Sequence, residues 1–306
     1  MSANQDQRCF TGWFAALMCC FVLPAATQVP DQARLIHSEK SLYRQVLVYE
    51  DDVNRCLCFT HQCAIGRQSC IDLKLPNHLV FEYTQMMLGS LFLVPDPQHV
   101  LVIGLGGGTL PLTLEKLVPH ADIDTVEVDP AVVIVAQRYF GFHADPRLHV
   151  IELDGRAYVR QAIRAGKRYD LIMLDAYDNQ YIPEHLLTRE FLSEVRQLLR
   201  PGGIVAANTF SQSKLYSNES VTYRAVFGQF YNVKSGNRVI LASNGPLPSI
   251  DTVTHNSRQF TNSFDALGIS SKRLVGQFSV EADWDTGARV LTDQYSPANL
   301  LNSAVP

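Results

Sequence analysis

Short apolar runs alternate along the middle of the chain with segments whose apolar residues recur at helical spacing. The runs are rich in branched residues and short enough to be buried strands. They cover residues 100–103, 125–128, 148–153, 169–174 and 204–208. The segments that predict helices cover residues 110–117, 130–140, 156–165 and 191–199. Strands that alternate with helices in this way predict an α/β fold with a doubly wound parallel sheet.

A strand-like pattern with alternating apolar positions precedes the doubly wound region and predicts a small antiparallel sheet. The strands expected there cover residues 45–49, 55–59 and 68–72. After them, residues 76–93 have apolar positions at helical spacing and predict a helix that ends before Pro95 and Pro97.

These patterns divide the chain into regions. The regions expected are a hydrophobic N-terminal extension or signal or anchor segment (1–33), a small β domain (34–75), a nucleotide-binding catalytic domain (76–245) and a C-terminal extension (246–306). Within the extension, residues 263–273 predict a helix, whereas 246–262 and 283–287 predict loops.

The N-terminal stretch 11–26 is apolar and almost uncharged. It is too short for a comfortable transmembrane helix but suits the apolar core of a signal peptide, and small residues at 25–27 resemble a cleavage site. Arg8 is offset by Asp6, which is not typical of a signal peptide. A cytoplasmic protein is slightly favoured, and export or membrane anchoring through 11–26 is the alternative.

Composition narrows the class of protein. Of the 306 residues, 46% are hydrophobic and 18% are charged, which describes a globular protein with a sizeable core. The formal net charge of −4 gives no sign of a nucleic-acid partner.

Four cysteines lie close together in the predicted small sheet: Cys56, Cys58, Cys63 and Cys70. They form no Cys-x-x-Cys pair and have no histidine at zinc-finger spacing, so we expect no metal site. In the cytosol they would be buried free thiols, whereas in an exported chain they could pair as disulfides.

A glycine-rich turn, Gly104-Leu-Gly-Gly-Gly108, follows the strand at 100–103 and opens a helix. Its glycines let the backbone pass close to a ligand, and the helix N-terminus offers unpaired N–H groups. The turn lacks the G-x-G-x-x-G spacing of dinucleotide sites and the lysine of a P-loop. A glycine turn with a ribose-binding glutamate also suits an S-adenosyl ligand, which carries no pyrophosphate; a tight turn without a ligand is the alternative.

Acidic residues follow the next strands, at the sheet edge where doubly wound folds bind ligands. Glu127 is placed to take both ribose hydroxyls of a nucleoside. Asp154, before Gly155, can accept a hydrogen bond from an adenine amino group or cap the next helix. Asp175 and Asp178 can hold a cationic amine and take its proton, or form an ordinary polar turn. The chemistry would be alkyl transfer from a sulfonium carbon, driven by orientation and a carboxylate base.

The motifs VLVIG with its glycine turn, VEVD, DPRLHV…DGRAY, YDLIMLDAYD, LTREF and LRPGGI run through residues 34–243. Together they resemble the spermidine/spermine synthase (polyamine aminopropyltransferase) family. The resemblance implies a Rossmann-like, methyltransferase-type domain behind a small β domain. It also implies aminopropyl transfer from decarboxylated S-adenosylmethionine to an amine such as putrescine, and a dimer or tetramer.

The resemblance also implies roles for individual residues. Asp175 would be the catalytic acid or base, with Asp178 beside it on a gating loop. Tyr83 and Gln85 would lie at the amine site. The donor would contact Gly104, Gly106, Gly108, Glu127, Asp154, Gly155 and Gln68.

Some positions depart from the family pattern. Gly107 stands where the family has an aspartate that holds the donor's ammonium group, Gln85 replaces a glutamate, and Val233 stands near the place of a late tyrosine. A subgroup with the same glycine turn carries Leu-Thr-Asp-x-x-x-Pro near its C-terminus, which matches residues 291–297. Asp293 is therefore a further candidate for the amine site.

Two alternative functions stay open. One is an S-adenosylmethionine-dependent methyltransferase, because glycine at 107 removes an acid that would repel a donor carboxylate. The other is a non-catalytic nucleoside-binding protein that keeps the pocket without the chemistry.

Overall fold

Two β-sheets organise the part of the chain that the structure describes, residues 33–176 and 183–299 of the computed structural model. The N-terminal stretch 11–26 and Asp178 lie outside these residues. Within the described ranges, no helix combines the length and hydrophobicity needed to cross a membrane.

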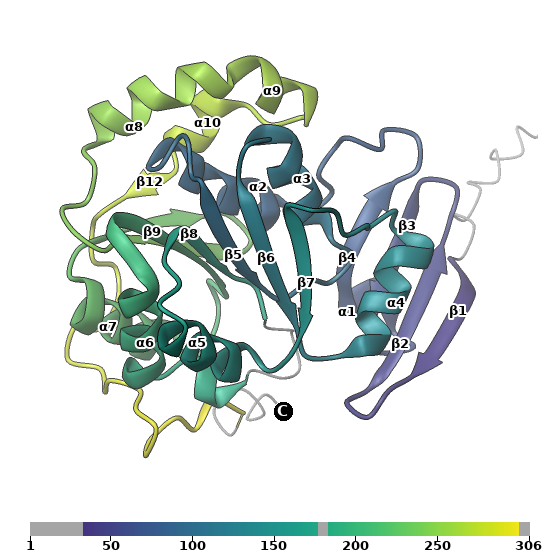
Figure 1. Ribbon diagram of the computed structural model, residues 1–306, viewed down its shortest axis with the longest axis horizontal. Helices are drawn as coiled ribbons and strands as arrows, with labels where there is room; N and C mark the ends of the chain where they lie inside the picture. Colours follow the sequence, from purple (N-terminus) through teal and green to yellow (C-terminus); the bar gives the residue numbers. More distant parts are fainter. Residues whose placement is uncertain (1–32, 177–182, 300–306) are drawn as a thin grey trace, which may run out of the picture. The chain divides into compact units, whose positions relative to one another are not determined.

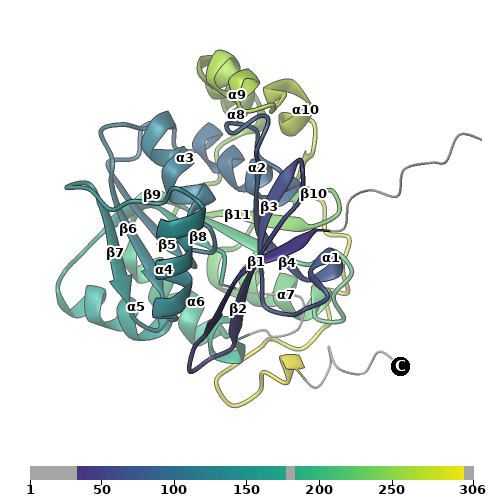
Figure 2. The ribbon, with the colours of Figure 1, turned by 90° about the vertical axis from the view of Figure 1, so that its right-hand side faces the viewer.

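The smaller sheet is antiparallel, with the strand order β1-β2-β3-β4, and confirms the sheet expected near the N-terminus. Its elements are β1 (Arg34–Lys40), β2 (Gln45–Glu50), β3 (Asn54–Cys58), the short helix α1 (Cys63–Gly66) and β4 (Arg67–Asp72). Val46, Val48 and Leu57 pack one face of this sheet against α4 (Pro130–Tyr139) (Figure 2). The small sheet is thus held beside the helix that follows Glu127.

The larger sheet has the strand order β12-β10-β11-β9-β8-β5-β6-β7. Its parallel strands are β5 (His99–Ile103), β6 (Asp122–Glu127), β7 (Leu148–Glu152), β8 (Tyr169–Leu174) and β9 (Leu199–Thr209). The chain moves outward from β5 in both directions, first to β6 and β7 and then to β8 and β9. The doubly wound parallel arrangement is therefore confirmed, and β5 marks the point where the strand order reverses.

Further strands that the apolar pattern does not single out extend the larger sheet in the antiparallel sense. They are β10 (Phe230–Lys234), β11 (Arg238–Ser243) and β12 (Phe278–Ser279). Every residue of β11 is buried, and β11 pairs with β9. Antiparallel strands need only a short hairpin, so they fall outside the alternation of strands and helices that predicts the parallel part.

Helices cover both faces of the larger sheet (Figure 1). One face packs against α2 (Glu82–Leu88), the 3₁₀ turn η1 (Gly89–Phe92), α3 (Thr109–Leu117), α8 (Ile250–Ser257), η3 (Arg258–Phe260), α9 (Thr261–Ala266) and α10 (Ser271–Val275). The other face packs against α5 (Gly155–Arg164), the 3₁₀ turn η2 (Glu184–Leu186), α6 (Arg189–Leu198) and α7 (Tyr216–Phe227).

The helix expected over 76–93 is shorter than its apolar pattern suggests. Only α2 and η1 are helical, because the chain before them pairs with other segments. Leu79 forms a bridge to Ile71 of β4, and its N–H donates to the carbonyl of Leu267 at 3.4 Å. Tertiary pairing therefore overrides helical spacing in the first part of this segment.

The C-terminal extension also differs from the prediction. The loop expected over 246–262 contains α8, whose first turn is capped by the hydroxyl of Ser249. The helix expected over 263–273 is divided into α9 and α10 by a turn at Gly268, which has a φ of +77°. The domain boundaries expected at residues 75 and 245 remain our proposal.

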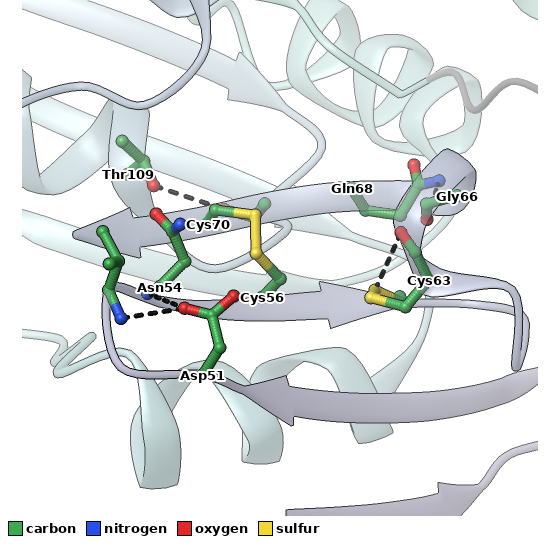
Figure 3. The surroundings of a disulfide bond; sticks show 11 residues. Asp51, Asn54, Cys56, Cys63, Gly66, Gln68, Cys70 and Thr109 are labelled. Carbon is green, nitrogen blue, oxygen red and sulfur yellow. Dashed lines mark hydrogen bonds between the residues drawn. A yellow bond between two sulfur atoms is a disulfide. The ribbon is translucent and has the colours of Figure 1, made fainter. Parts of the chain in front are cut away.

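The clustered cysteines are paired, Cys56 with Cys70 and Cys58 with Cys63. Figure 3 shows the first bond joining the neighbouring strands β3 and β4, with Gln68 on the same strand as Cys70. Free thiols, expected for a cytosolic chain, are therefore not what the structure has. The structure thus has the second arrangement that the sequence left open, in which these cysteines pair.

Candidate active site

A cavity of about 240 Å³ lies at the carboxyl ends of the parallel strands. The turn after β5, the chain after β6 and β8 and the start of α5 line it, and the small sheet supplies another wall. The predicted site residues around it are Gly104, Gly106, Glu127, Asp154, Gly155, Asp175, Gln68 and Tyr83. The fold therefore gathers candidates from distant parts of the sequence around one space.

The turn after β5 passes very close to the chain after β8 at Gly104. This glycine has a φ of +102°, and a Cβ placed on it would lie 2.1 Å from the carbonyl oxygen of Asp175. Its N–H donates to the carbonyl of Val126 at 2.8 Å. Gly106, with a φ of +54°, borders the cavity without a side chain. Only glycine tolerates both the left-handed backbone and the close approach.

The later glycines of the turn serve packing. Gly108 precedes α3 with a φ of +80°, and a Cβ on it would lie 2.5 Å from the ring of Phe142. A Cβ on Gly107 would lie 2.7 Å from Ser69 Oγ and 3.0 Å from the ring of Phe140. Neither glycine lines the cavity. Gly108, expected to contact the donor, thus lies outside the cavity lining, and a side chain at position 107 would have to displace Ser69 or Phe140.

Glu127 ends β6 with its carboxylate held by the backbone. Its Oε2 accepts the N–H of Leu105 and its Oε1 accepts the N–H of Asp129, both at 3.0 Å. Burial raises the pKa of this carboxyl, and the backbone donors oppose that rise. Each oxygen retains a second lone pair, so the oriented carboxylate can accept two ribose hydroxyls.

Asp154 both caps a helix and borders the cavity, so the two sequence-based interpretations are compatible. Its Oδ1 accepts the N–H of Ala157 at 2.9 Å at the start of α5. Its Oδ2 lies 2.8 Å from Nε2 of His185, and this hydrogen bond is the main reason that the pKa of Asp154 is lowered. Next to it, a Cβ on Gly155 would lie 2.6 Å from the side chain of Ile103.

Asp175 directly follows β8 and is held from two sides. Asn208 Nδ2 donates to its Oδ1 at 3.0 Å, and the hydroxyl of Tyr83 donates to the same carboxylate. Burial raises the pKa of Asp175 to about 7, although both hydrogen bonds lower it. A carboxylate with this pKa can accept a proton near neutral pH.

Two residues predicted for the amine site do not line the cavity. Gln85 Nε2 donates to the carbonyl of Leu79 at 3.1 Å. Asp293 binds Arg156, whose Nη1 and Nη2 donate to its two carboxylate oxygens at 2.7 and 2.8 Å. Their partners explain these positions, since each polar group is used within the fold. Asp178 lies outside the described residues.

Other side chains at or next to the cavity were not predicted. Asn208 is the next-to-last residue of β9, so a strand-end rule extended by one position would have found it. His185 is the middle residue of η2 and lines the cavity. Tyr43 and Arg44 come from the turn between β1 and β2, with the Arg44 guanidinium 4.3 Å from the centre of the Phe59 ring. No local pattern marks these two, because only packing of the small sheet brings them to the cavity.

The arrangement supports nucleoside binding next to a proton acceptor. Glu127 and Asp154 offer oriented carboxylate oxygens, and Asp175 offers a buried carboxylate with a raised pKa. Within residues 33–176 and 183–299, no three His, Cys, Asp or Glu side chains converge as a metal site.

Sequence comparison finds a matching protein family and a relative that is similar along almost the whole chain. The family described as spermine/spermidine synthase domain matches residues 80–235. A polyamine aminopropyltransferase of Vibrio vulnificus is 43% identical over 292 residues, which cover 94% of this chain and 96% of that protein.

Solved structures share the fold. Spermidine synthase from Thermotoga maritima superposes with a TM-score of 0.58 at 23% identity. The superposed part includes 81% of this chain and 85% of the Thermotoga chain. Human methyltransferase-like protein 13 in complex with SAH superposes with a TM-score of 0.53 at 25% identity. The superposed part includes 68% of this chain and 96% of the human chain.

Proposed function

Because the chain belongs to the spermine/spermidine synthase family, we propose that it transfers an aminopropyl group from decarboxylated S-adenosylmethionine to a small amine such as putrescine. One observation carries the proposal. Glu127, Asp154 and Asp175 come from different strand ends and border the same cavity. That placement suits a reaction in which a nucleoside donor and an amine must meet in line.

In the proposed complex, the chain holds the donor mainly through its adenosine part. Glu127 accepts the ribose hydroxyls, and Asp154 accepts the adenine amino group. Gly104 and Gly106 leave the backbone open to the ligand, and Gln68 borders the same space. The named activity of the 43% identical relative supports the decarboxylated form of the donor.

Asp175 is the proposed base. The bound donor supplies an electrophilic carbon attached to a positively charged sulfur. Asp175 orients the acceptor amine and accepts its proton as the new N–C bond forms, and the C–S electron pair remains on sulfur. Tyr83 and Asn208 keep the carboxylate aimed. Asp178 beside the amine, and assembly into a dimer or tetramer, belong to the same proposal.

Substitution of the base tests the reaction. We expect Asp175→Asn to lower kcat by about 100-fold or more, because the amide cannot take the proton. Turnover is measured as release of methylthioadenosine from decarboxylated S-adenosylmethionine with putrescine. Unchanged turnover in Asp175→Asn would argue against the assigned base.

A matched control and a second donor sharpen this experiment. Asp122→Asn removes an exposed carboxylate at the start of β6, away from the cavity, and should leave kcat unchanged. Supplying S-adenosylmethionine in place of its decarboxylated form tests the methyltransferase alternative. Methyl transfer without aminopropyl transfer would overturn the proposal.

A further inference from the structure

Residues 291–299, here called the C-terminal strap, lie outside the cavity but are bonded to the segment that forms one of its walls. Figure 1 shows them at the yellow end of the described chain, beside α5 and α6. The strap is attached to residues 184–190 at several points. The bonds are Arg189 N–H to Leu291 O at 2.9 Å, and Asp293 N–H to Glu190 Oε2, Ser296 Oγ to Glu184 O and Asn299 N–H to Glu184 Oε1 at 3.0 Å each.

Arg156 joins the strap to the cavity wall. Its side chain is 8% exposed, and its Nη1 and Nη2 donate to both carboxylate oxygens of Asp293. Nη1 also donates to the backbone carbonyl of His185 at 3.3 Å, and Nε donates to Glu194 at 3.0 Å. A guanidinium held by two carboxylates in fork geometry has a fixed plane. Arg156 can therefore hold the backbone of His185 in one place.

His185 carries this constraint to the cavity. Its Nε2 lies 2.8 Å from Oδ2 of Asp154, and both residues line the cavity. The Thr188 hydroxyl, at the start of α6, donates to Asp293 at 2.6 Å and fixes the same segment from its other end. A shift of the η2 backbone would therefore move the imidazole that orients the carboxylate proposed to accept the adenine amino group.

We infer that Asp293 is a positioning residue for the adenine end of the donor pocket, acting through Arg156 and His185 on Asp154. This inference rests on the proposed function, because it requires an adenosyl ligand at Asp154. The inference assigns the C-terminal strap a role in donor affinity. It places Asp293 in support of the donor site and not at the amine site. Removal of the Asp293 charge should weaken donor binding while the chemistry at Asp175 is retained.

The direct test measures nucleoside binding without turnover. Methylthioadenosine, the nucleoside left by aminopropyl transfer, is titrated by calorimetry into the full chain and its variants. We expect Asp293→Asn to raise the Kd about fivefold, since a bidentate, partly exposed ion pair is lost. In steady state, KM for the donor should rise by the same factor, with kcat and KM for the amine unchanged.

Controls distinguish positioning from loss of fold. Asp285→Asn removes another acid of the C-terminal extension, whose Oδ1 accepts only a local N–H from Gly287 in the described contacts, and should leave the Kd unchanged. Ser296→Ala removes a single hydrogen bond from the strap and should raise the Kd about twofold. Melting temperatures are recorded for each variant. Binding by Asp293→Asn at wild-type affinity would overturn the inference.

A double-mutant cycle tests the route through His185. His185→Ala should weaken nucleoside binding, and Asp293→Asn should add little to it because the link to Asp154 is already lost. Fully additive effects would contradict this route. Wild-type protein that binds no methylthioadenosine would overturn the proposed function and this inference together, whereas normal binding by Asp293→Asn overturns the inference alone.

Discussion

At the scale of single residues, Asp175 sets the expected pH dependence. Burial raises its pKa to about 7, and only the ionised carboxylate can take a proton from the amine. We therefore expect kcat/KM, which reports the groups of the free enzyme, to rise with pH through about 7. Steady-state rates across this range check the prediction. A kcat/KM that stays constant from about pH 5.5 upward would exclude Asp175 as the titrating base.

The partner of Asp175 should move this pH profile. The hydrogen bond from Asn208 lowers the pKa of Asp175, so Asn208→Ala raises it, and the midpoint of the kcat/KM profile should shift to higher pH. Asn218→Ala is the matched control, because the Asn218 amide donates to the carbonyl of Arg289 instead. A midpoint that stays at the wild-type pH would show that Asn208 does not act on the base.

At the scale of elements, the turn between β5 and α3 depends on one close approach. Alanine at Gly104 would place its Cβ 2.1 Å from the backbone oxygen of Asp175, at a φ of +102°. The left-handed backbone alone costs ~1–2 kcal/mol, and the clash must also displace β8 from β5. We expect Gly104→Ala to lower the free energy of unfolding by at least about 3 kcal/mol.

A second glycine separates the cost of the left-handed backbone from the cost of the steric clash. Gly166 has a φ of +71°, but a Cβ on it would meet nothing within 4 Å, so Gly166→Ala should cost only ~1–2 kcal/mol. Urea denaturation of both variants measures the difference. If both variants lose the same free energy of unfolding, the close approach of position 104 to the Asp175 carbonyl oxygen adds nothing to the cost of the left-handed backbone.

At the scale of the whole molecule, a buried ion pair holds the antiparallel strands to the parallel part. Arg238 of β11 is 0% exposed and donates to Glu219 of α7 at 2.7 Å and to Thr209 of β9 at 2.6 Å. Removing one partner leaves the other charge buried and unpaired. We expect Arg238→Met to lower the free energy of unfolding by ~3–5 kcal/mol at neutral pH.

The sign of the pH effect follows from Glu219. Burial raises the pKa of its carboxyl, and the Arg238 guanidinium opposes that rise, so Arg238→Met raises the pKa further. Between the ordinary pKa of glutamate and the raised pKa of Glu219, the carboxyl keeps its proton in the folded variant but loses it in the unfolded chain. The free energy of unfolding of the variant therefore falls as the pH rises between these two values. The loss measured by urea denaturation should be larger at alkaline than at mildly acidic pH. The double variant Glu219→Leu/Arg238→Met should regain much of it.

Local patterns were enough to predict the parallel half of the fold and several of the residues around the cavity. Buried parallel strands are short apolar runs, and their carboxyl ends converge on one edge. Glu127, Asp154 and Asp175 could therefore be selected by position alone. The same rule could not find Tyr43 or Arg44, whose approach to the cavity depends on how the small sheet packs against α4.

The amino-acid order by itself determined the strand and helix alternation, the glycine turn and the family, because each is recognised from short stretches of neighbouring residues. Only the tertiary structure decided the pairing of β9 with β11, the side chains of Ser69 and Phe140 that surround Gly107 and the partner of Asp293. Each of these joins segments that are far apart along the chain. A hydrogen bond or a steric contact between such segments has no local pattern, so it becomes visible only when packing has placed both sides.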